Sequence, residues 1–230
     1  MKSKFLVFLV FFTIVFAGFS QEQGFETADK FFQKVVDSYS QIDDYEADVI
    51  LESSSSKLSG KLSYKYPDGF RLDFDYPDEQ VWILSNNQLI LHFPRQVTFV
   101  QPLQEGEDAG DGNGIGFASR DGLKTLQKGY KFSYLVSYSP MPLDEIDTTI
   151  MVYKLKGEWK SIDEGFKSLE ISVMQHSDGS FLIRRISGIN RNSAQYQIDF
   201  TNYKLNINIP RSRFDDYEIP SDSGHQQSIF

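Results

Sequence analysis

The chain has 230 residues, with 23 Lys and Arg against 32 Asp and Glu, so its formal net charge is −9. One domain, or at most two small ones, is expected at this length. A sequence pI near 4.8 leaves no surplus of basic side chains to neutralise phosphates, which argues against broad nucleic-acid binding. The chain contains no cysteine, which excludes disulfides, thiolate metal sites, a Cys nucleophile and an acylated-cysteine anchor.

The first 20 residues have the pattern of a secretory signal peptide. Two lysines open the segment, residues 5–17 are apolar apart from one threonine, and small residues precede a cleavage point before Gln21. The apolar run is shorter than the ~20 residues that a membrane-spanning helix needs. We therefore predict export with cleavage near residue 20, which leaves residues 21–230 as a single acidic, soluble domain.

One helix and then a series of short strands are predicted for the first half of this domain. Over residues 24–41 the apolar side chains recur at i, i+3, i+4, i+7 and i+8, and Thr27 is a suitable N-cap. From residue 45 the period changes to two, which is typical of half-buried antiparallel strands. Strands are expected at residues 45–51, 58–66, 70–76, 81–84, 89–93 and 97–100. Their short connections allow only neighbouring strands to pair, which predicts a meander.

The second half begins with a Gly-rich, acidic segment at 104–116, which predicts a surface loop. A helix is expected over residues 117–130, shortened or broken by Gly122 and Gly129. Further strands are expected at residues 131–138, 148–155, 167–174, 181–188 and 196–203. The polar tail from Pro220 is expected to be mobile. The predicted fold class is α+β: a strongly curved antiparallel sheet, an incomplete β-barrel, whose concave side is covered by the helices.

No catalytic or metal-binding constellation stands out in the sequence. The three histidines are far apart, and the segment 104–116 does not match a calcium-binding loop. Asp73 and Asp75 share one face of a predicted strand, so acid–base chemistry is one hypothesis, and the solvated face of an amphipathic strand is the simpler one. We predict a protein that is not an enzyme and has no cofactor.

The sequence is rich in aromatic side chains, with 20 Phe, 12 Tyr and 2 Trp. Residues 81–84 and 89–91 are apolar on both faces of their predicted strands. Two interpretations remain open. Either one face forms the core and the other carries scattered exposed apolar residues, or a concave face beneath the helices holds an apolar ligand. Composition does not separate them.

Several short stretches, taken in order, resemble one known family. Residues 64–74 read YKYPDGFRLDF, followed by PDEQ at 77–80, LSNN at 84–87 and LILHFP at 89–94; near the end come QIDF at 197–200, then Ile209-Pro210, Phe214 and Pro220. This order and spacing are similar to the LolA-type outer-membrane lipoprotein carriers. The chain departs from the family pattern at Asn86-Asn87, where Asp-Gly is common, and at Leu72, where Trp is common.

This resemblance implies an incomplete β-barrel plugged by helices and a periplasmic chaperone that carries lipoproteins from the inner to the outer membrane. The implied partners are acylated lipoproteins, an inner-membrane lipoprotein-releasing ABC transporter of the LolCDE type and, where one exists, an outer-membrane acceptor. The carrier is expected to be a monomer. A regulatory periplasmic domain of the same half-barrel shape, which senses lipids or lipoproteins, is the alternative.

A soluble carrier needs an apolar cavity, because exposing acyl chains to water costs ~0.8 kcal/mol per CH₂. We predict that the cavity is lined by apolar residues from the first helix and the meander: Phe31, Phe32, Val35, Val36, Leu72, Phe74, Trp82, Leu84, Leu91 and Phe93. The resemblance places Tyr66 where the family has a lid-latching Arg, with Arg71 nearby as a substitute. It also places Phe70 at an aromatic position that docks on the releasing complex.

Overall fold

The computed structural model describes residues 25–76, 80–86, 88–93, 97–102, 118–146, 148–160, 166–190, 193–218 and 224–227. The predicted signal peptide and the predicted loop at 104–116 lie outside these residues. Within the described ranges, no helix combines the length and the apolar character that crossing a bilayer requires.

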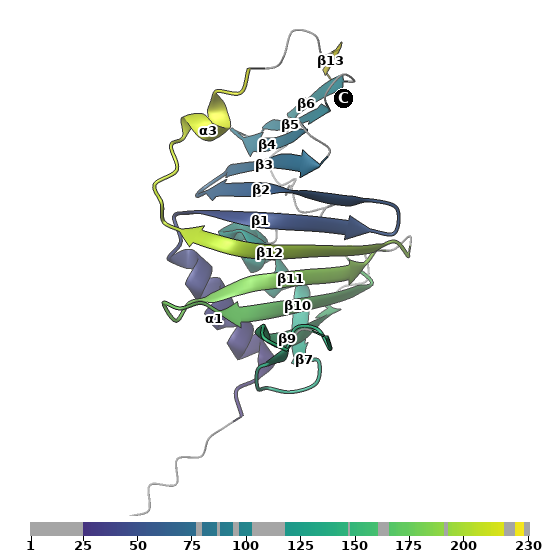
Figure 1. Ribbon diagram of the computed structural model, residues 1–230. Coiled ribbons are helices and arrows are strands. Elements are labelled where there is room, and N and C mark those ends of the chain that lie inside the picture. Colours follow the sequence, from purple (N-terminus) through teal and green to yellow (C-terminus); the bar gives the residue numbers. More distant parts are fainter. Residues whose placement is uncertain are drawn as a thin grey trace, which may run out of the picture.

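The strands form one continuous, strongly curved sheet (Figure 1). Its order from one edge to the other is β13 (Gly224–Gln227), β6 (Val97–Pro102), β5 (Gln88–Phe93), β4 (Val81–Ser85), β3 (Gly69–Tyr76), β2 (Lys57–Lys65), β1 (Asp44–Ser53), β12 (Gln195–Leu205), β11 (Phe181–Ile189), β10 (Ser168–Gln175), β9 (Met151–Trp159) and β7 (Tyr130–Tyr134). A two-residue strand, β8 (Met141–Pro142), pairs with β9 outside this order. Because β13 and β7 stand at opposite edges, the sheet does not close, and the predicted incomplete barrel is confirmed.

The predicted meander is present as β1 to β6, in which each strand pairs antiparallel with the next. The second half of the sheet grows from the other side of β1, where β12 pairs with it and sets Val49 opposite Phe200. Strands far apart in the sequence therefore meet at the centre of the sheet. This long-range pairing decides which strands lie beneath the helices.

Helix α1 (Ala28–Ser40) begins as predicted, with Thr27 Oγ1 accepting a hydrogen bond from the backbone N–H of Lys30 at 3.3 Å. Its buried face packs on β7 and β11, on the concave side of the sheet. Helix α2 (Arg120–Gly129) is shorter than predicted but unbroken. Gly122 lies in its first turn, where its N–H donates to the Ser119 cap at 3.0 Å, and Gly129 is its last residue. Glycines at helix ends cost less than glycines in the middle, so they shorten this helix without interrupting it.

The C-terminal segment after β12 has more structure than the sequence suggested. It includes the short helix α3 (Ser212–Asp215), which lies beside β3 and β4, and the side chain of Phe214 is only 1% exposed. Residues 224–227 form β13, which pairs in parallel with β6. For these four residues the expectation of a mobile tail is wrong, because the edge strand β6 offers unpaired backbone groups that the tail can bond.

Candidate functional site: the concave face of the sheet

The strand residues predicted to line a cavity share one face of β3, β4 and β5. The register sets Trp82 opposite both Leu72 and Leu91. Since side chains alternate along a strand, the same face carries every second residue of each strand: Leu72, Phe74, Trp82, Leu84, Leu91 and Phe93. Leu72 and Phe74 are buried, and the other four are only partly buried. We name these six residues the apolar face.

The predicted helix residues contact the opposite end of the sheet. The ring of Phe31 lies 4.4 Å from that of Tyr153 on β9 and 5.0 Å from that of Phe181 on β11, and Phe32 stacks on Phe132 of β7 at 4.0 Å. Phe31, Phe32, Val35 and Val36 are all between 0% and 6% exposed. The α1 end of the concave side is therefore filled by the protein's own side chains. The ring contacts described for Phe31 and Phe32 are with β7, β9 and β11 rather than with Trp82 or Phe93.

Residues 81–84 are apolar on both faces of β4, and each face packs in a different part of the structure. In β4, Val81 and Ile83 point to the face opposite Trp82, and Ile83 is 1% exposed. The C-terminal segment covers this face, because α3 contacts β3 and β4 and Phe214 is buried there. The outer side chains of residues 81–84 thus belong to a second small core, and the inner ones belong to the apolar face.

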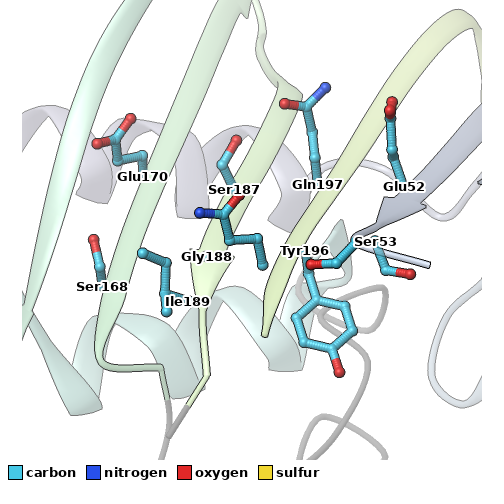
Figure 2. A pocket seen from close by; sticks show the side chains of 11 residues that line it. Glu52, Ser53, Ser168, Glu170, Ser187, Gly188, Ile189, Tyr196 and Gln197 are labelled. Carbon is cyan, nitrogen blue, oxygen red and sulfur yellow. The ribbon is translucent and has the colours of Figure 1, made fainter. Parts of the chain in front are cut away.

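The outer, convex side of the sheet carries a hollow of about 370 Å³ with a mixed polar and apolar lining. Figure 2 shows its row of side chains from neighbouring strands, Glu170, Ser187, Gln197 and Glu52, which lie opposite one another in the register. These residues alternate with core residues such as Ile171, so they face away from α1. Carboxylate, hydroxyl and amide groups share this lining with the apolar side chains of Ile189 and Tyr196, so an acyl chain bound here would lie beside charged groups. Among the described residues, no group of three or more His, Asp and Glu side chains is placed to hold a metal ion.

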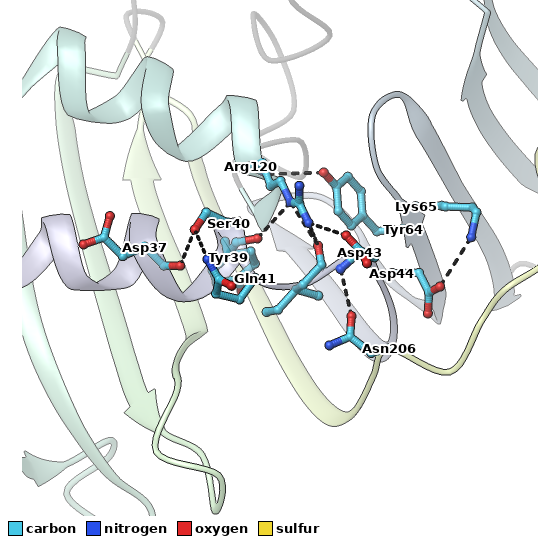
Figure 3. A network of polar contacts seen from close by, with 11 residues as sticks. Asp37, Tyr39, Ser40, Gln41, Asp43, Asp44, Tyr64, Lys65, Arg120 and Asn206 are labelled. Atoms are coloured by element: carbon cyan, nitrogen blue, oxygen red, sulfur yellow. Dashed lines mark hydrogen bonds and ion pairs between the residues drawn. The ribbon is translucent and has the colours of Figure 1, made fainter.

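One arginine ties α2 to the end of α1 (Figure 3). The Arg120 Nε donates to the carbonyl oxygens of Tyr39 and Ile42, both at 3.1 Å, and its Nη2 donates to Ile42 at 2.8 Å and to Asp43 Oδ1 at 2.7 Å. Its guanidinium lies 4.2 Å from the ring centroid of Tyr66. We call this set the Arg120 clamp. It gives charged donors to carbonyls at the C-terminal end of α1, where the helix leaves acceptors without partners.

Four tyrosines lie near the clamp: Tyr39 on α1 and Tyr45 and Tyr64 on the sheet, which are buried, and Tyr203, which is partly buried. Tyr45 Oη donates to the carbonyl of Ala118, just before α2, at 2.6 Å, and the hydroxyls of Tyr39 and Tyr203 lie 3.3 Å apart. Burial raises the pKa of Tyr39 and of Tyr64 to about 12, and it raises the pKa of Tyr45 and Tyr203 well above the usual value. The helices are therefore joined to the sheet through neutral hydroxyl groups over the whole physiological pH range.

The residues predicted for latching and docking are separated by the structure. Tyr66 contacts the Arg120 clamp, whereas Arg71 bonds Asp73 and donates to the carbonyl of Arg213 at 3.0 Å, on the opposite face of the sheet. Phe70 is partly buried on the concave side, opposite Tyr64 and Leu84. Sequence reasoning missed Arg120, because it follows the Gly-rich segment and only the fold brings it to Tyr66.

No family model and no curated protein sequence matches this chain. Among solved structures, an uncharacterized conserved protein from Thermus thermophilus overlaps with a TM-score of 0.53 at 12% identity, over 85% of this chain and 98% of that one. MucB overlaps with a TM-score of 0.53 at 9% identity, over 85% of this chain. The fold is shared with both. The chain spans 63% of the MucB chain.

The matched structures also include a LolA superfamily protein. The LolA superfamily protein NE2245 from Nitrosomonas europaea overlaps at 12% identity over 82% of this chain and 97% of that one, with a TM-score of 0.41.

Proposed function

We propose that the chain is a non-enzymatic periplasmic carrier that shelters the acyl chains of lipoproteins against the apolar face. The observation that carries the proposal is the unequal filling of the concave side. The predicted α1 residues Phe31, Phe32, Val35 and Val36 are buried, whereas Trp82, Leu84, Leu91 and Phe93 stay partly exposed on β4 and β5. A contiguous apolar surface that stays partly exposed is typical of a binding site.

The chemistry of this surface suits an acyl chain that must be bound and then released. Sheltering an acyl chain of about 15 methylenes offsets on the order of 12 kcal/mol of unfavourable hydration. Hydrocarbon side chains supply this without directional contacts, so lipoproteins with different polypeptides can be accepted. Moderate complementarity keeps the affinity low enough for transfer to a membrane acceptor.

In this proposal the Arg120 clamp holds α2 closed over the end of the sheet and opens when a lipoprotein enters. The clamp is local, because its hydrogen bonds join α2 to the turn after α1 and leave the strand pairings untouched. Opening it costs a few hydrogen bonds rather than part of the sheet. Loading from an inner-membrane releasing transporter of the LolCDE type and delivery to an outer-membrane acceptor complete the proposed route.

The test is mass spectrometry of protein isolated from its native envelope, comparing wild type with Leu84→Glu and Ile207→Glu. Leu84 belongs to the apolar face, whereas Ile207 is 43% exposed in the C-terminal segment. We expect acylated lipoprotein with the wild type and with Ile207→Glu, and at least a tenfold loss with Leu84→Glu. Circular dichroism confirms that both variants are folded. Wild-type protein without acylated ligand, or equal loading of the two variants, contradicts the proposal.

A transfer assay separates carriage from the sensing alternative. Loaded protein is mixed with acceptor vesicles, and the acylated lipoprotein that reaches the vesicles is measured. A carrier transfers its ligand, and we expect more than half of it to move. A sensing domain instead retains the lipid and captures an envelope signalling protein, and that result would replace the proposed carrier function.

A further inference from the structure

The sequence contains two tryptophans, Trp82 and Trp159, and within the described residues neither indole Nε1 has a hydrogen-bond partner, although both atoms are buried. An indole nitrogen can only donate. A buried donor without an acceptor costs roughly 1–3 kcal/mol, so such groups are rare in folded proteins and call for an explanation.

The two indoles lie in different surroundings. Trp159 packs under the end of α2, with its ring centroid 4.5 Å from that of Tyr130 and its edge against Gly129. Its ring is partly buried against the core. Trp82 lies instead in the middle of the apolar face, between Leu72 and Leu91 in the register and 4.9 Å from the ring of Phe74. Its described neighbours on this face are hydrocarbon side chains, so the unpartnered Nε1 is one polar donor buried among apolar groups.

We propose that Trp82 Nε1–H binds the carbonyl oxygen of an acyl ester or amide, so that this face recognises acylated molecules rather than plain hydrocarbon chains. This inference rests on the proposed carrier function. An ester or amide carbonyl is neutral, and a single donor satisfies it. A free carboxylate is a poorer fit, because burying its charge against one neutral donor and hydrocarbon side chains is costly. Recognition of the carbonyl would also fix how far each acyl chain extends along the apolar face, since this carbonyl joins the acyl chain to the lipoprotein.

The experiment compares two probes of equal length, a long-chain fatty acid methyl ester and the matching alkyl ether, which lacks the carbonyl. Binding of radiolabelled probe is measured for wild type, Trp82→Phe and Trp159→Phe. We expect the wild type and Trp159→Phe to bind the ester about three- to tenfold more tightly than the ether. In Trp82→Phe this preference should disappear through loss of ester affinity alone, with the ether affinity unchanged.

Trp159→Phe also leaves Trp82 as the sole tryptophan, so its indole N–H gives one proton resonance. We expect this resonance to move downfield with the ester and to stay in place with the ether. Equal affinity for both probes, or equal loss of both in Trp82→Phe, overturns the carbonyl inference and leaves the carrier function standing. If neither probe binds the wild type, both proposals fail. An indole resonance that is already downfield without probe and unchanged by the ester identifies a buried water as its partner and also overturns the inference.

Discussion

Substituting Arg120 with alanine tests whether the clamp holds α2 in place. The Arg120 side chain is 14% exposed and donates to the carbonyls of Tyr39 and Ile42. Hydrogen bonds from a charged donor contribute roughly 1.5 kcal/mol or more each. The contact with the Tyr66 ring adds about 0.5–1 kcal/mol. The ion pair with Asp43 adds little, because the Asp43 side chain is 82% exposed and screened by water.

These contributions predict that Arg120→Ala destabilises the docked state of α2 by about 2–4 kcal/mol. A ten-residue helix is not stable by itself in water, so losing the clamp should let α2 open locally. Amide hydrogen exchange measures this directly. Exchange of the α2 amides should accelerate by about 30- to 700-fold, because a tenfold change corresponds to about 1.4 kcal/mol. The amides of β1 and β12 should change far less.

Lys124→Ala is the matched control on the same helix. The Lys124 Nζ pairs with Asp121 at 3.0 Å, but both side chains are about half exposed, so its loss should cost less than about 0.5 kcal/mol. Equal α2 exchange rates in the two variants would show that Arg120 does not hold α2 in place. Equal acceleration of exchange in every strand by Arg120→Ala would show that the clamp stabilises the whole fold rather than α2.

Three further predictions concern the C-terminal segment, the centre of the sheet and the buried tyrosines. Phe214→Ala should lower the free energy of unfolding by about 2–4 kcal/mol in denaturant titrations, since the ring is 1% exposed. Ile207→Ala, at a site 43% exposed, should cost less than about 1 kcal/mol. Equal effects of the two substitutions would show that the outer core contributes nothing. Gly60→Ala should cost more than about 2 kcal/mol, because its added Cβ would lie 2.8 Å from a backbone Cα of β3, and an unchanged melting temperature would contradict this. Because burial raises the pKa of Tyr39 and Tyr64 from 10.0 to about 12, their stabilising effect is complete below pH 10 and is lost as the pH rises towards 12, at up to about 1.4 kcal/mol per pH unit for each. The tyrosinate absorbance that is lost in Tyr39→Phe and in Tyr64→Phe reports these two side chains. In the wild type it should appear together with the loss of circular dichroism, and its appearance near pH 10 with the fold intact would refute the assignment.

The elements themselves could be predicted because their signals are local. The Thr27 cap and the i, i+3, i+4 spacing define α1, and period-two alternation with short turns defines the meander, so β4 and β5 lie within one residue of their expected bounds. Elements without a local signal were missed. The strand β13 forms only because the edge of β6 is available for pairing, and that edge lies far earlier in the chain.

The sequence by itself determined the fold class, the order of the elements and the existence of an apolar strand surface, because hydrophobic period and turn chemistry depend on neighbours along the chain. Only the tertiary structure decided which apolar residues face each other. The pairing of β12 with β1 brings β11 beneath α1, so Phe31 meets Phe181 instead of Trp82. The tertiary structure also brings Arg120 to Tyr66, and it places the C-terminal segment on the outer face of β4. Alternation reveals that a strand has two faces, but what covers each face depends on long-range contacts that no local pattern encodes.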